Sequence, residues 1–116
     1  MKSAFLVTVD PNSQAGTVDL GYDHQFTEIR RTPIATDVAQ SLIDAFTELP
    51  PGGGDLCFDP VFVVELRDGD DVQWSGAACF DCGTFYSTDG LGPDGGMFDQ
   101  TSDAAKRLLD RMRNLA

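Results

Sequence analysis

The segment CFDPVFVVELRDGDDVQWSGAACFDC, residues 57–82, contains two apolar runs that flank an acidic turn. The Asp-Gly pair in this turn is typical of a β-hairpin. If Leu66 lies opposite Val72, then Val64 faces Trp74, and one face of both strands is apolar throughout. The segment therefore predicts an antiparallel hairpin that buries one face.

A helix is predicted over residues 37–49, before the hairpin. Its apolar residues recur at helical spacing and form one stripe. Thr36 or Asp37 is a suitable N-terminal cap, and Asp37 with Gln40 three residues later has the spacing of a capping box. Pro50 ends the helix. The stripe predicts that this helix packs on a sheet.

A second helix is predicted over residues 102–115, at the end of the chain. Thr101 or Ser102 is suited to cap its start, and Asp103 suits the positive end of the helix dipole. The residues of its apolar stripe are Ala105, Leu108, Leu109, Met112 and Leu115. This pattern also indicates a helix with one buried side.

Further strands are predicted over residues 3–9, 17–22, 25–31 and 83–89, the first two as a starting hairpin. The order of strands and helices favours the α+β class. We expect a single domain over residues 1–116, with an antiparallel sheet of about four to six strands and both helices packed on one face.

The charge of the chain is strongly negative and unevenly distributed. The net charge is −11 at pH 7, yet residues 101–116 carry four basic and two acidic residues, which leaves −13 for residues 1–100. Such a field repels nucleic acids and anionic membranes and favours a basic protein partner, while the alternative is that the charge serves only solubility or reflects a salt-rich habitat. We expect a binding module of the immunity-protein, inhibitor or nucleic-acid-mimic type. The acidic residues expected to contact the partner are Asp68, Asp70, Asp71, Asp89 and Asp94.

The three cysteines of the chain are predicted to meet at one end of the hairpin. The register above places Cys57 opposite Asp81, makes Cys79 its diagonal neighbour and leaves Cys82 just past the strand. Three thiolates are a partial zinc site, and His24, the only histidine, is a candidate fourth ligand, with Asp59, Asp81 or water as the alternatives. The C-x-x-C motif also permits thiol redox chemistry, and buried structural thiols are the third interpretation.

The cysteine segment resembles a group of small bacterial proteins for which no activity is known. In that group a Cys-x-Pro or Cys-x-x-Pro entry to one strand precedes a Cys-Phe-x-Cys strand, and the resemblance covers roughly residues 57–90. The residues that carry it here are Cys57, Pro60, Cys79, Phe80 and Cys82. The resemblance implies no catalytic role for any residue.

The sequence contains no motif that specifies a reaction. There is no G-x-S-x-G nucleophile elbow, and the single histidine limits Ser-His-Asp chemistry to one candidate base. No apolar run is long enough for a signal peptide or a membrane span, and an odd number of cysteines fits a reducing compartment. We therefore expect a cytoplasmic protein that is not an enzyme and carries no cofactor, with zinc as the alternative.

Overall fold

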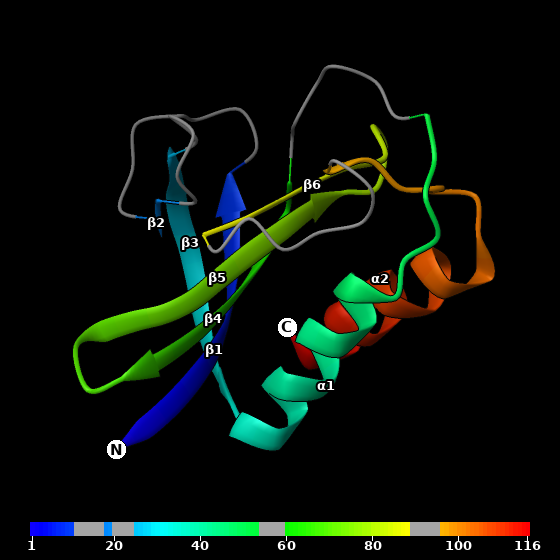
Figure 1. The fold of residues 1–116 in the computed structure, drawn as a ribbon. Helices are drawn as coiled ribbons and strands as arrows, with labels where there is room; N and C mark the ends of the chain where they lie inside the picture. Colours follow the sequence, from blue (N-terminus) through cyan, green and yellow to red (C-terminus); the bar gives the residue numbers. More distant parts are fainter. Residues whose placement is uncertain (11–17, 20–24, 54–59, 89–95) are drawn as a thin grey trace.

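An antiparallel sheet carries two helices on one of its faces (Figure 1). The computed structural model describes residues 1–10, 18–19, 25–53, 60–88 and 96–116. The strands are β1 (Lys2–Asp10), β2 (Val18–Asp19), β3 (Gln25–Ile34), β4 (Phe62–Asp68), β5 (Asp71–Cys79) and β6 (Thr84–Ser87). The helices are α1 (Thr36–Thr47) and α2 (Asp103–Leu115). These elements confirm the predicted α+β class with helices on one face.

The strands lie in the order β2-β3-β1-β4-β5-β6. The predicted starting hairpin is wrong, because β1 pairs with β3 and β4, whereas the two-residue strand β2 pairs with β3. β1 occupies the middle of the sheet because its residues are buried on both faces. Leu6 belongs to the core beneath the helices, while Val7 and Val9 belong to a cluster on the opposite face.

The predicted β4–β5 hairpin is present, but a β-bulge at Leu66/Arg67 divides its register, which differs from the prediction by one residue next to the turn and by two beyond the bulge. Leu66 lies opposite Trp74, and Asp68 pairs with Asp71 across a turn that contains Gly69. Gly69 has a φ of 61°, a conformation that glycine adopts at little cost. The predicted turn is longer than the observed one. The shift of two residues leaves Leu66 and Trp74 on their expected face, whereas Val72 pairs with Arg67 and lies on the opposite face.

The two helices start differently from one another. The residue before α1 is Ala35, whose side chain makes no capping bond, and Asp37 instead accepts a hydrogen bond from the backbone N–H of Val38 at 2.9 Å. The predicted capping box is therefore wrong. At α2 the cap is Ser102, one of the two predicted candidates, since its hydroxyl accepts a hydrogen bond from the N–H of Ala105 at 3.2 Å.

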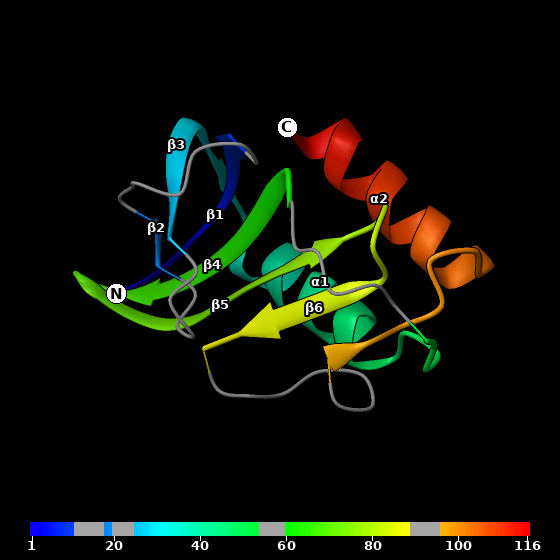
Figure 2. The ribbon, with the colours of Figure 1, turned by 90° about the horizontal axis from the view of Figure 1, so that it is seen from above.

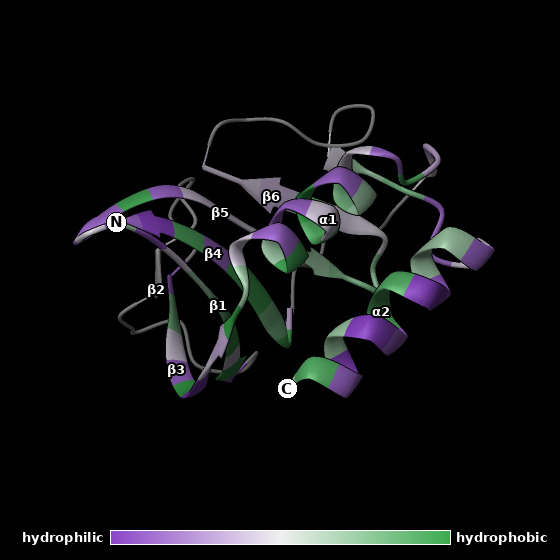
Figure 3. Cartoon of the chain, turned by 90° about the horizontal axis from the view of Figure 1, so that it is seen from below, coloured by the Kyte–Doolittle hydropathy of each residue, from purple (hydrophilic) through white to green (hydrophobic). Residues whose placement is uncertain are grey.

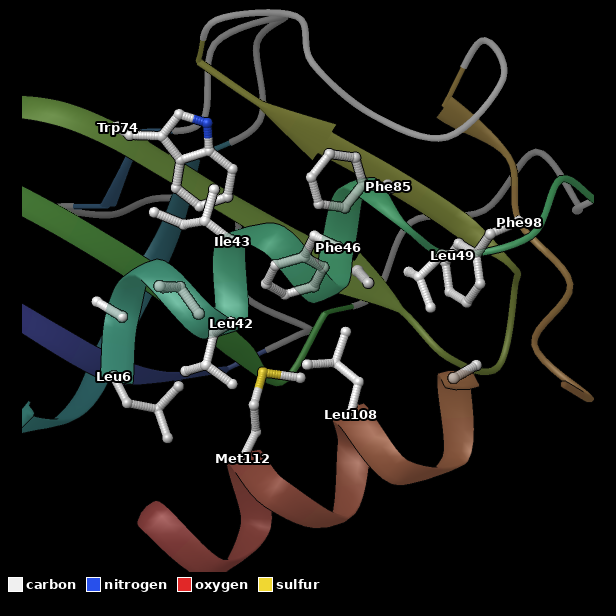
Figure 4. Packing of buried hydrophobic residues seen from close by; sticks show 14 of the residues in the cluster. Leu6, Leu42, Ile43, Phe46, Leu49, Trp74, Phe85, Phe98, Leu108 and Met112 are labelled. Carbon is white, nitrogen blue, oxygen red and sulfur yellow. The ribbon is translucent and has the colours of Figure 1, made fainter. Parts of the chain in front are cut away.

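The main core lies between the sheet and the two helices (Figure 4). Phe46 of α1 packs against Phe85 of β6, with ring centroids 5.0 Å apart, and against Trp74 of β5 at 6.2 Å. Leu108 and Met112 of α2 point into the same cluster. Hydrophobic and hydrophilic residues alternate along both helices, as expected of helices with one buried side (Figure 3).

A smaller apolar cluster lies on the opposite face of the sheet, which the helices leave uncovered (Figure 2). It consists of Val7, Val9, Phe26, Val63, Ala77, Cys79 and Cys82, with Phe5 and Tyr86 packed against it. We call this side the second face. Charged residues lie at one end of the second face, and two of the three cysteines, Cys79 and Cys82, lie at the other end.

Candidate functional site

Three of the predicted partner-binding residues lie at the β4–β5 turn, which we call the acidic tip (Asp68, Asp70 and Asp71). The tip is exposed and projects away from the helices (Figure 1). The N-terminal ammonium lies 3.0 Å from Asp68, whereas no Lys or Arg of the described chain lies within ion-pair distance of Asp70 or Asp71. The neighbouring Val72 is 45% exposed. The tip thus combines unneutralised carboxylates with apolar surface.

Next to the tip, on the second face, two arginines share buried and half-buried carboxylates. Arg31 of β3 lies 2.6 Å from both Glu28 and Glu65, and Arg67 of β4 donates through Nε to the same oxygen of Glu65. We call these four residues the arginine cluster. Glu65 is only 3% exposed. The guanidinium of Arg31 also lies over the ring of Phe5, 4.9 Å from its centroid, in cation–π geometry.

The two arginines keep Glu65 ionised inside the sheet. Burial alone raises the pKa of Glu65, but hydrogen bonds and positive charge from Arg67 and Arg31 outweigh it, so this pKa lies below its ordinary value. Burial lowers the pKa of Arg31, while Glu65 and Glu28 raise it above its ordinary value. Glu65 therefore acts as a fixed negative charge that holds both guanidinium groups in place.

A β-bulge brings Arg31 into the arginine cluster. On β3, Arg30 pairs with Thr8 and Glu28 pairs with Val9, so Ile29 is an extra residue without a partner on β1. Strict alternation predicts that Glu28 and Arg30 share a face. The bulge instead places Glu28 and Arg31 together, which sequence reasoning missed because the pattern carries no signal for a bulge.

The cysteines occupy two chemical states. Cys79, at the end of β5, is a buried free thiol, whereas Cys82 is disulfide-bonded in the turn that follows. The prediction that Cys82 lies just past the strand is confirmed, while Cys57 and His24 lie outside the described residues. A disulfide sulfur is not a thiolate, so Cys82 becomes a zinc ligand only after reduction.

Asp89 and Asp94 fall outside the described residues. Within the described ranges, no group of three or more His, Cys, Asp or Glu is placed to hold a metal ion, and neither helix is long and apolar enough to cross a membrane. Comparison of the chain with protein-family models, with curated proteins and with solved structures found no match.

Proposed function

We propose that the protein is an acidic binding module that engages a basic protein surface. The observation that carries this proposal is the exposure of unneutralised carboxylates at the acidic tip. Glu28 and Glu65 are paired within the fold, whereas Asp70 and Asp71 project from a hairpin whose strands are fixed by the sheet. A rigid element that presents negative charge provides steering and specificity for a partner of opposite charge.

A second acidic surface allows the role of the tip to be tested at constant net charge. Asp37, Asp44 and Glu48 are exposed along α1. The variant D68N/D70N/D71N and the control D37N/D44N/E48Q each remove three negative charges, but from different surfaces. Any difference between them in binding reports where the partner contacts the protein.

The experiment is affinity capture from the host, followed by titration of each captured protein in purified form. We expect a basic partner whose dissociation constant rises with ionic strength, and which the tip variant weakens at least tenfold more than the α1 control. If both variants weaken binding equally, binding depends only on the overall charge and not on the acidic tip. Binding that is independent of salt, or a partner that is itself acidic, contradicts the proposal.

The alternative function is thiol or zinc chemistry at Cys57, Cys79 and Cys82. One observation favours the thiol form of this alternative, namely that the free thiol of Cys79 lies three residues before a disulfide-bonded cysteine and in the same apolar cluster. Elemental analysis of reduced protein addresses zinc directly. A stoichiometric zinc content that is lost on oxidation supports the metal site, and its absence in reduced protein contradicts it.

A further inference from the structure

An open hollow of about 340 Å³ lies on the second face, between the arginine cluster and the acidic tip. Its lining comes from β1, β3, β4 and the β4–β5 turn. The residues that line it are Ser3, Phe5, Arg31, Arg67, Gly69 and Asp70. The volume is at the lower end of the range of small-molecule sites, but the hollow is wide open and its lining is mainly polar, with Phe5 as its aromatic side chain.

Sheet pairing explains why these residues lie together. Ser3 lies opposite Arg67 and Phe5 opposite Glu65 in the β1–β4 ladder. Cross-strand partners of this kind are immediate neighbours on one face of a sheet. The hollow is therefore built on strands, and only Gly69 and Asp70 belong to a turn.

Arg67 has hydrogen-bonding capacity that the fold does not use. Its Nε donates to Glu65, but no atom of the described residues accepts a hydrogen bond from either of its Nη nitrogens. An arginine fork with two open nitrogens is suited to bind a carboxylate with two parallel hydrogen bonds. Because Glu65 already holds Nε, the fork is oriented before any ligand arrives, which reduces the entropic cost of binding.

Asp70 supplies the opposite charge in the same hollow. No ion pair connects Asp70 to Arg67 or Arg31, although all three line the space. A ligand with one carboxylate and one ammonium group satisfies both sides, and its neutral net charge avoids repulsion by the acidic chain. The ring of Phe5 offers an apolar wall for the rest of such a ligand.

We propose that this hollow binds a zwitterionic small molecule of the amino-acid class that carries an apolar side chain. The carboxylate is expected on the Nη nitrogens of Arg67 and the ammonium on Asp70, with the apolar group against Phe5. This site goes beyond the proposed function and does not depend on it. A titration without any protein partner tests it, so the two proposals fail separately.

The test is a titration of isotope-labelled protein, followed by NMR, at constant ionic strength with three probes. L-phenylalanine carries both charged groups, 3-phenylpropanoate lacks only the ammonium, and phenethylamine lacks only the carboxylate. For a ligand of about a dozen heavy atoms in an open hollow we expect a dissociation constant of order 1 mM for L-phenylalanine. The largest NMR chemical-shift changes should occur at the Gly69 amide and the Arg67 Nε–H group. Each probe that lacks one charged group should bind at least about tenfold more weakly than L-phenylalanine.

Two variants and one control locate the binding. R67Q should abolish binding of L-phenylalanine, and D70N should remove its advantage over 3-phenylpropanoate. The control R107Q changes an exposed arginine of α2 outside the hollow and should leave binding intact. R67K, which keeps the charge but not the fork, replaces R67Q if that variant unfolds. The proposal is overturned if phenethylamine binds as tightly as L-phenylalanine, if the arginine-67 variant binds normally, or if shifts spread evenly over all arginines.

Discussion

Replacing Glu65 with Gln should destabilise the protein by about 2–3 kcal/mol at neutral pH. Removing one partner from a fully buried ion pair costs about 3–5 kcal/mol, because the remaining charge stays buried without compensation. Here the cost is smaller, since the side chains of Arg31 and Arg67 are 26% and 28% exposed and reach water. Arg31 also keeps its pairing with Glu28. Urea unfolding of both proteins measures the difference.

The pH dependence of this difference tests its electrostatic origin. The pKa of Glu65 is lowered in the folded protein, so its contribution is fully present above the ordinary glutamate value of about 4.3. The contribution is lost as the pH falls through the lowered folded-state pKa, because wild-type Glu65 then becomes neutral. The difference in free energy of unfolding between wild type and E65Q should therefore be constant near neutral pH and become smaller in acid.

The matched control is Glu48→Gln at the exposed C-terminal cap of α1, which removes the same charge from a solvated position. Surface substitutions of this kind usually change stability by no more than about 0.5 kcal/mol. If E65Q costs no more than E48Q, the arginine cluster contributes nothing to folding. If the gap between wild type and E65Q stays the same in acid, the loss comes from packing and not from charge.

Two further predictions concern β5. Gly76→Ala should lower the free energy of unfolding by about 1–3 kcal/mol, measured by thermal unfolding, because an added Cβ lies 2.4 Å from the ring of Trp74. The control Gly53→Ala, whose Cβ meets nothing within 4 Å, should be neutral or slightly stabilising. Equal effects of the two substitutions would contradict this prediction. Thiol titration of the unfolded protein should find one reactive thiol before reduction and three after it. In the folded protein the buried Cys79 should not react. Three reactive thiols in the unfolded protein before reduction would rule out the disulfide.

Local patterns predicted the helices and the sheet well. Apolar spacing predicts α1 and α2 within about two residues, and the cap of α2 is predictable to one of two neighbours, Thr101 or Ser102, because its bond lies within one turn of chain. The β4–β5 register was missed because alternation fixes the face of each residue, while turn geometry fixes the opposing partner. Gly69 was visible in the sequence, but its place in a two-residue turn was not.

The candidate sites depended more on contacts between distant strands. The acidic tip was predictable, because Asp68, Asp70 and Asp71 are adjacent in the chain and belong to one turn. The arginine cluster joins β3 to β4 across β1, so its members are neighbours only after the sheet has formed. A sequence signal existed in the alternation of Val63, Glu65 and Arg67, which places a charged residue on a face that also carries buried valine.

The bulge in β3 has a consequence for how the protein behaves at high concentration. The outer side of β3 from Glu28 to Ile34 pairs with no described strand, and such an edge is a template for aggregation. The bulge at Ile29 interrupts the ladder, Pro33 cannot donate a hydrogen bond, and Arg30 adds an exposed charge. The same irregularity that assembles the arginine cluster thus also disfavours the pairing of this edge with a second copy of the chain.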